Sequence, residues 1–175
     1  MNFKKIIWIL IFPLAFNSCK DDDVVGCMDE LASNYNADAE IDAPCTFNTT
    51  DVLVSNPWLI ASATGVVEGF ETDLLGIVDL IPACTHDNLF IFGEDNYVTM
   101  DDNLILCENG EESLLDLSGT WIVEGNILTI ENGSDTYVLT VDDLTNSSMD
   151  LLFDYNFDFN GNIFPIPAKI VLEKS

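Results

Sequence analysis

The chain has 175 residues and a formal net charge of −26, with 31 acidic residues against five lysines and no arginine. A protein this acidic repels phosphate backbones, which argues against nucleic-acid binding because such binding needs a basic surface. A hydrophobic content of 48% argues against disorder of the main body, since disordered chains combine high net charge with low hydrophobicity.

The first eighteen residues have the pattern of an export signal. Lys4 and Lys5 precede an apolar run over residues 6–16, which is shorter than the ~20 residues that a membrane-spanning helix needs. A short apolar run behind positive charges is typical of a signal peptide that is removed on export. Its removal takes away two lysines and no acid, so the net charge of the mature chain falls from −26 to −28.

Residues 18–23 resemble the processing site of bacterial lipoproteins. Ser18-Cys19 stands at the end of the apolar run, as in a lipobox, and Lys20 with three aspartates follows it. The resemblance implies that Cys19 is the first mature residue, carries a diacylglyceryl group with fatty acyl chains such as palmitate, and anchors the protein to the outer membrane. The acidic tract resembles the one that directs lipoproteins of Bacteroidota-type bacteria to the cell surface, with the inner face of the outer membrane as the alternative.

Four cysteines remain after Cys19, and an even number in an exported chain indicates disulfides. Three pairings are possible, and closeness in sequence favours Cys27–Cys45 and Cys84–Cys107. Each bridge would close a loop of about twenty residues and stabilise the folded state by on the order of 3 kcal/mol. The chain contains no C-x-x-C pair, so neither a zinc site built from four cysteines nor a redox-active dithiol is predicted.

Residues 26–47 contain a Gly-Cys start, an Asn-Tyr-Asn core and an acidic run before the second cysteine. The segment resembles a short module found in secreted proteins of marine and Bacteroidota-type bacteria. We expect residues 19–53 to be a lipidated tether that includes the disulfide-closed segment 27–45. Four of its polar side chains are candidate calcium ligands, because Ca²⁺ prefers six to eight oxygens, or else simply form Asx turns: Asn34, Asn36, Asp38 and Asp42.

Short apolar runs rich in β-branched and aromatic residues alternate with turn signals from residue 54 to residue 175. Asn-Gly pairs at 132–133 and 160–161 are the strongest short-range hairpin signal. The pattern predicts an all-β fold, an antiparallel meander of about eight strands that forms a lipocalin-like barrel or a strongly curved sheet. The expected strands are 58–67, 88–92, 96–100, 120–124, 127–131, 136–141, 149–159 and 163–172.

Two stretches of this domain carry more detailed expectations. Phe153, Tyr155, Phe157 and Phe159 alternate with polar residues, which predicts a strand with one buried face. Residues 68–80 do not follow the strand pattern and are expected to be a short helix or a loop over one mouth of the barrel.

Several motifs of the domain resemble the lipocalin-like domains of Bacteroidota lipoproteins. They include Trp58 at the start of the first strand, the run from Cys84 to Phe92, and Ser118-Gly119-Thr120-Trp121. The resemblance implies a barrel that binds a small apolar or amphiphilic molecule without catalysis. The alternative is a filled barrel whose outer surface binds an envelope protein or a glycan, because a fold alone does not establish an activity.

No catalytic motif accompanies the single histidine, His86, although Asp87 follows it directly. A catalytic triad needs a nucleophile beside an oriented base, and no such motif is present, so a structural role is expected for His86. We therefore expect no enzymatic activity and no cofactor or metal, and the expected partners are the membrane, a small apolar ligand and an envelope protein.

Overall fold

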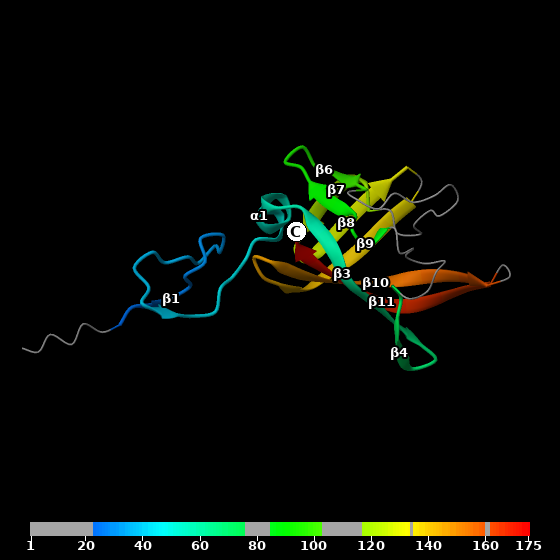
Figure 1. Ribbon diagram of the computed structural model, residues 1–175, viewed down its shortest axis with the longest axis horizontal. Helices are drawn as coiled ribbons and strands as arrows, with labels where there is room; N and C mark the ends of the chain where they lie inside the picture. Colours follow the sequence, from blue (N-terminus) through cyan, green and yellow to red (C-terminus); the bar gives the residue numbers. More distant parts are fainter. Residues whose placement is uncertain (1–22, 76–84, 103–116, 134, 160–161) are drawn as a thin grey trace, which may run out of the picture.

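The computed structural model describes residues 23–75, 85–102, 117–133, 135–159 and 162–175. An N-terminal module precedes a β-barrel (Figure 1). The module contains two short parallel strands, β1 (Val25–Gly26) and β2 (Ile41–Asp42), and helix α1 (Thr49–Ser55) connects it to the barrel. Cys19 and the predicted signal peptide, residues 1–18, lie outside the described residues.

Nine antiparallel strands form the main sheet. In chain order they are β3 (Trp58–Val67), β4 (Phe70–Asp73), β5 (Leu89–Phe92), β6 (Tyr97–Asp101), β7 (Gly119–Glu124), β8 (Ile127–Asn132), β9 (Asp135–Leu144), β10 (Ser148–Phe159) and β11 (Asn162–Lys174). Their order is β11-β10-β9-β8-β7-β6-β5-β3-β4, and β11 also pairs with β3. Eight strands therefore close into a barrel, and β4 lies outside the ring as the second strand of a hairpin with β3. The predicted all-β antiparallel barrel is confirmed.

Each of the eight expected strands is present, with ends that differ by three residues at most. The expectation for residues 68–80 is wrong over Phe70–Asp73, which form β4. Glu68 and Gly69 both have positive φ and turn the chain so that Phe70 pairs with Val67. The rest of that stretch, from residue 76, lies outside the described residues.

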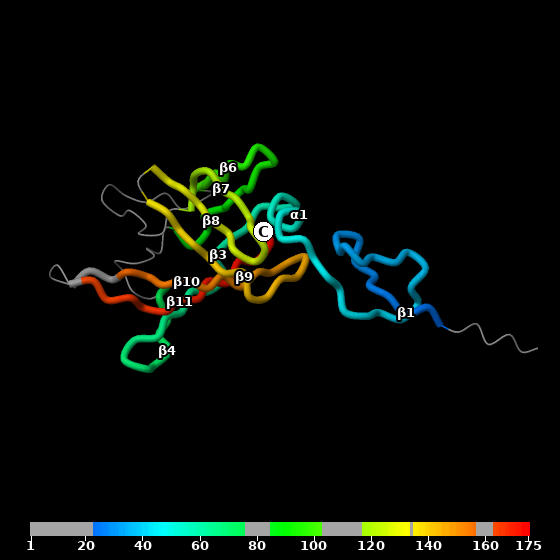
Figure 2. Tube along the Cα trace, turned by 180° about the vertical axis from the view of Figure 1, so that it is seen from behind, coloured from blue at the N-terminus to red at the C-terminus, as the bar shows by residue number. Residues whose placement is uncertain are grey.

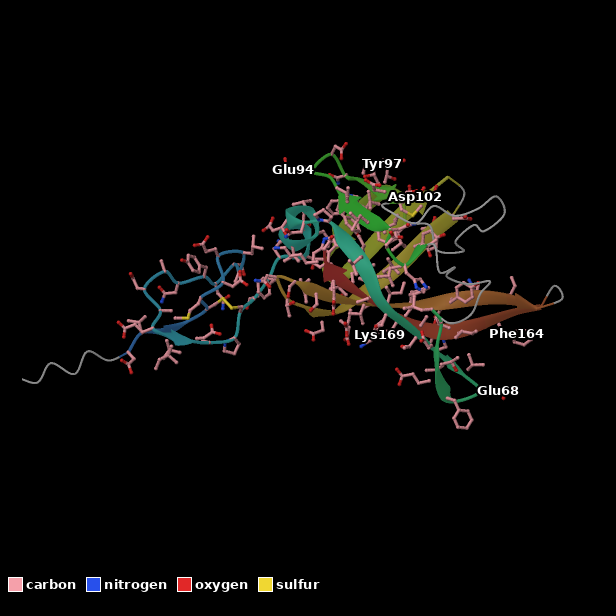
Figure 3. All side chains as sticks on the ribbon, viewed as in Figure 1. Glu68, Glu94, Tyr97, Asp102, Phe164 and Lys169 are labelled. Atoms are coloured by element: carbon pink, nitrogen blue, oxygen red, sulfur yellow. A yellow bond between two sulfur atoms is a disulfide. The ribbon has the colours of Figure 1, made fainter. Side chains whose placement is uncertain are left out.

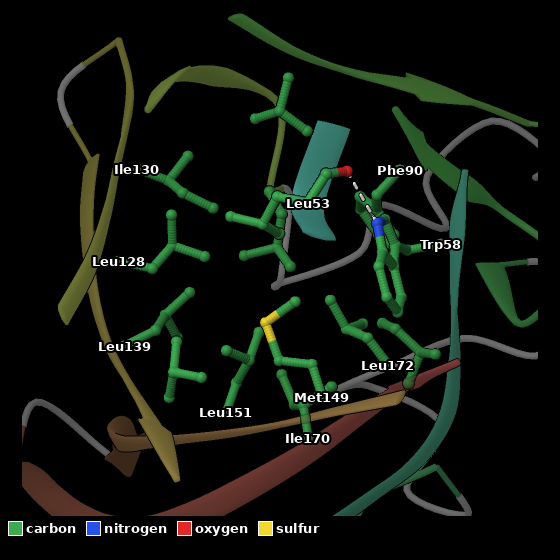
Figure 4. Packing of buried hydrophobic residues seen from close by; sticks show 14 of the residues in the cluster. Leu53, Trp58, Phe90, Leu128, Ile130, Leu139, Met149, Leu151, Ile170 and Leu172 are labelled. Carbon is green, nitrogen blue, oxygen red and sulfur yellow. Dashed lines mark hydrogen bonds between the residues drawn. The ribbon is translucent and has the colours of Figure 1, made fainter. Parts of the chain in front are cut away.

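Helix α1 closes one end of the barrel, although it was not expected from the sequence. Asn48 caps it by accepting a hydrogen bond from the backbone N–H of Asp51, and its apolar residues Val52 and Leu53 are fully buried in the core. The expected domain start at about residue 54 thus falls inside a helix that packs with the barrel. The carbonyl of Leu53 accepts a 2.9 Å hydrogen bond from Nε1 of Trp58, which fixes the helix to the first barrel strand (Figure 4).

The β10–β11 hairpin extends beyond its pairing with the neighbouring barrel strands β9 and β3. It pairs without interruption from Ser148 with Glu173 to Phe159 with Asn162. Its outer half projects beyond the ring, away from α1 (Figures 1 and 2). On one side β9 follows β10 only as far as Leu152, and on the other β3 follows β11 only as far as Ala168. Two forks therefore open where this hairpin leaves the barrel.

Gly119 permits the close approach of β7 and β8. Its φ is +137°, and a Cβ at this position would lie 2.1 Å from the carbonyl oxygen of Glu131. Because that neighbour is backbone, the clash requires the two strands to separate. We expect Gly119→Ala to lower the free energy of unfolding by roughly 3 kcal/mol or more, from backbone strain and overpacking together.

Urea unfolding followed by tryptophan fluorescence measures this effect. Gly125→Ala is the matched control, because Gly125 also has positive φ (+65°) but has no atom near its Cβ position. Its cost should be only about 1–2 kcal/mol, the intrinsic penalty of the left-handed conformation. Equal costs for the two variants would contradict the close approach described for Gly119.

Candidate functional site

The N-terminal module is held by a disulfide and by tight backbone packing. Cys27 and Cys45 are bonded, with their Cα atoms 5.0 Å apart, which confirms the first predicted pair. A Cβ on Gly26 would lie 2.8 Å from that of Asn36, so the chain segments approach too closely here for any other residue. Cys84 and Cys107, the second predicted pair, lie outside the described residues.

Three of the four candidate calcium ligands, Asn34, Asn36 and Asp42, accept backbone hydrogen bonds within the module. Asn34 accepts from the N–H of Thr46 at 2.8 Å and donates to the carbonyl of Pro44 at 3.0 Å, which ties the middle of the loop to its C-terminal end. The side-chain oxygen of Asn36 accepts from the N–H of Asp38, the geometry of an Asx turn. This arrangement favours turn formation over calcium binding, because both amide oxygens already accept backbone hydrogen bonds.

The described part of the chain contains no cluster of three or more His, Cys, Asp or Glu side chains arranged to hold a metal ion. His86 is half-buried beside the buried Asn88, and its Nε2 has no hydrogen-bond partner among the described residues. No helix of the described part is long and apolar enough to cross a membrane.

The barrel interior next to α1 is filled with side chains. Trp58 lies against Phe90 at the wall, and the centre is occupied by aliphatic residues from α1, β8, β9, β10 and β11 (Figure 4). Each has less than 2% of its surface exposed: Leu53, Leu128, Ile130, Leu139, Met149, Leu151, Ile170 and Leu172. Trp58, which opens the first barrel strand, is therefore part of a solid core at this end.

The aromatic residues further along β10 are less completely covered. Phe153 and Tyr155 pack against the core from the same strand face as Leu151, and both are half-buried. Burial raises the pKa of the Tyr155 hydroxyl above its usual value of 10.0. The expected alternation is confirmed for these two residues, whereas the side chains of Phe157 and Phe159 lie outside the described part.

The outer surface of the barrel has two hollows, one at each fork of the β10–β11 hairpin. The first, of about 350 Å³, is bounded by β9, β10 and β11 and includes Val138, Phe153 and Asp154. The second, of about 270 Å³, is bounded by β11 and the β3–β4 hairpin and includes Val66 and Glu71. Three residues line both hollows: Leu152, Pro167 and Ala168. We call the combined surface the fork surface.

Register explains how this surface is assembled. Leu152 pairs with Thr140 on one side and with Lys169 on the other, and Lys169 pairs with Thr64. Residues paired across antiparallel strands point to the same face, and the alternate residues Leu151, Ile170 and Ala63 are buried in the core. The row that contains Leu152 therefore points outward across five strands, since Thr64 pairs further with Asp73 of β4.

Most residues that line the fork surface are uncharged, and its charged residues are the acids Asp154 and Glu71 and the base Lys169. Lys169 is the basic residue at its centre and bonds Asp150 at 2.8 Å (Figure 3 shows the position of Lys169). That hydrogen bond, then attraction to Asp150, Glu71 and Asp142, raises the pKa of the Lys169 ammonium. A raised lysine pKa means that the interaction persists at neutral pH and is lost only as the pH rises beyond it. Three acids, Asp150, Glu71 and Asp142, therefore act on the single cation Lys169.

No protein-family model matches this chain, and no curated protein matches it.

The role of Asn34 can be tested directly. Asn34→Ala removes both hydrogen bonds that join the middle of the module loop to its C-terminal end, each worth about 1 kcal/mol. We expect faster cleavage within residues 27–45 under limited proteolysis, with an unchanged melting temperature of the barrel. Asn34→Asp is the control, because it keeps the acceptor for Thr46 and loses only the donor to Pro44. If added calcium slowed the proteolysis of the wild-type module, the purely structural role of Asn34 would be contradicted.

Proposed function

We propose that this chain is a lipid-anchored cell-envelope protein that binds another envelope component through the outside of its barrel and performs no catalysis. The proposed anchor is Cys19, supported by the signal-like residues before it and the acidic tract after it. Val24 is five residues from Cys19, so the module lies within roughly 17 Å of the lipid even if the chain is extended. With a mature charge of −28, the body of the protein is repelled by anionic headgroups, and the lipid alone holds it at the membrane.

One observation carries the choice of an outer binding surface. The interior beside α1 is packed with fully buried side chains, whereas the hollows of the fork surface open to solvent on the outside. A barrel of about eight strands is either filled by its own side chains or holds one small ligand, and the fully buried side chains beside α1 support the filled case. The filled barrel then acts as a rigid support for the strands and hairpins that it displays.

Binding of a small apolar ligand is the second candidate function. It is favoured by the half-buried Phe153 and Tyr155, which lie on the core-facing side of β10 beyond the filled part of the barrel. Such a ligand would contact these rings at the end of the barrel opposite α1. An antiparallel barrel is compatible with the lipocalin-like fold, in which ligands occupy the open end of the interior.

Native mass spectrometry of the full chain released from gently solubilised membranes separates the two candidates. We expect a stoichiometric complex with a partner polypeptide and no small-molecule adduct on the chain. A stoichiometric apolar adduct, lost on Tyr155→Ala, would establish the second candidate instead. Recovery of the chain only as a free monomer with no adduct would contradict both.

The anchor has its own prediction. Cys19→Ala removes the proposed acylation site, so we expect the protein to move from the membrane fraction to the soluble fraction. Its folded domain should have the same size as in the wild type. The double variant Cys27→Ala, Cys45→Ala is the control, because it removes two cysteines but should remain in the membrane. Membrane retention of Cys19→Ala after a carbonate wash would exclude lipid attachment as the means of anchoring.

A further inference from the structure

The β10–β11 hairpin has two edges of different character where it leaves the barrel. From Phe153 to Phe159, β10 pairs with β11 and with no other described strand. β3 stops pairing with β11 at Ala168, and the edge of β11 that is left open beyond this point carries Pro165 and Pro167. Proline has no N–H, and it is a common means of blocking an edge against further strand pairing. The β10 edge contains no proline and is therefore not blocked in this way.

The prolines also reveal the direction of the main-chain groups on β10. Pro167 pairs with Asp154 and Pro165 pairs with Asn156. A proline cannot donate to the opposite strand, so these are the non-hydrogen-bonded pairs of the ladder, in which each residue points its N–H and C=O away from its partner. The N–H and C=O groups of Asp154 and Asn156 consequently face the open edge. Leu152, two residues earlier, has the same orientation and pairs with Thr140 of β9.

We propose that this edge of β10 accepts an extended segment of a partner protein in which cationic residues alternate with apolar ones. The segment would continue the sheet from Leu152 by pairing with Asp154 and Asn156. This proposal rests on the proposed function and specifies the surface and the partner that it needs.

The alternation follows from the two faces of β10. On the outer face, Asp154 lines the first hollow of the fork surface beside Val138, and an added strand would place its outward side chains next to this carboxylate. Opposite charges across neighbouring strands are favourable, which selects lysine or arginine at those positions. On the inner face, Phe153 and Tyr155 are only half-buried, so the intervening residues of the added strand would be apolar and cover these rings.

Charge excludes the competing occupants. A second copy of the chain, paired edge to edge through β10, would bring the Asp154 carboxylates of the two copies close together on a sheet that carries no described cation at this edge. An anionic membrane surface would be repelled by the same carboxylates. A cationic strand gains from main-chain hydrogen bonds, from charge and from apolar contact together, which is the mode of recognition known as strand addition.

The test uses the full chain in mild detergent and a fluorescently labelled peptide of alternating lysine and valine. Fluorescence anisotropy should show saturable binding that weakens with added salt, and a peptide of alternating glutamate and valine should not bind. Asn156→Pro should raise the dissociation constant at least tenfold, because it removes the N–H from the open edge. The hairpin should keep its own pairing in this variant, since that N–H does not face β11.

Two further variants make the result specific. Asp154→Lys should weaken binding at least tenfold, whereas Glu94→Lys, at an exposed acid of the β5–β6 turn distant from this edge, should leave binding within twofold. Absence of lysine–valine peptide binding, or equal binding by Asn156→Pro and wild type, would overturn the proposal. If Asn156→Pro still forms the stoichiometric membrane complex, the partner binds elsewhere, so the strand site fails while the proposed function stands.

Discussion

Pairing between the first and last strands of the sheet is the constraint on which the rest of this structure depends. β3 and β11 pair from Trp58 with Lys174 to Gly65 with Ala168, joining residues more than a hundred positions apart in the sequence. This pairing converts a meander with two open edges into a closed ring. It also encloses the space that α1 and the inward side chains fill, because Trp58 begins the closing strand and binds the carbonyl of Leu53.

The same closure determines which surfaces are left for recognition. The ring uses only the first part of β10 and the last part of β11, so the remainder of that hairpin extends beyond it and the neighbouring strands separate from it on both sides. Hollows form at these separations, with Leu152, Pro167 and Ala168 common to both. The fork surface is therefore a direct result of unequal strand lengths around a closed barrel, and its excess of acids over bases follows from a composition with few cations to offset the carboxylates.

Much of the fold could be predicted from local sequence, because each barrel strand alternates between a buried and an exposed face. Helix α1 could not, since seven residues are too few to show helical periodicity, and its only strong local signal is the cap at Asn48. β4 was also missed, because Phe70 is 74% exposed and only pairing with β3 makes the segment a strand. The Cys27–Cys45 bridge followed from spacing alone. The forks depend on where long-range pairing stops, which no local pattern encodes.

The N-terminal module and the C-terminal residue lie near the same end of the barrel. The C-terminal residue donates its N–H to the carbonyl of Pro57, beside α1, and the module on the N-terminal side contacts the neighbouring β9–β10 turn through a hydrogen bond from Asn146 to Asp29. The described N-terminal module and the C-terminal residue therefore lie at one pole of the barrel, and the β10–β11 hairpin projects from the other (Figures 1 and 2). A protein or tag fused after Ser175 would emerge beside α1 and leave the hairpin at the opposite pole unobstructed.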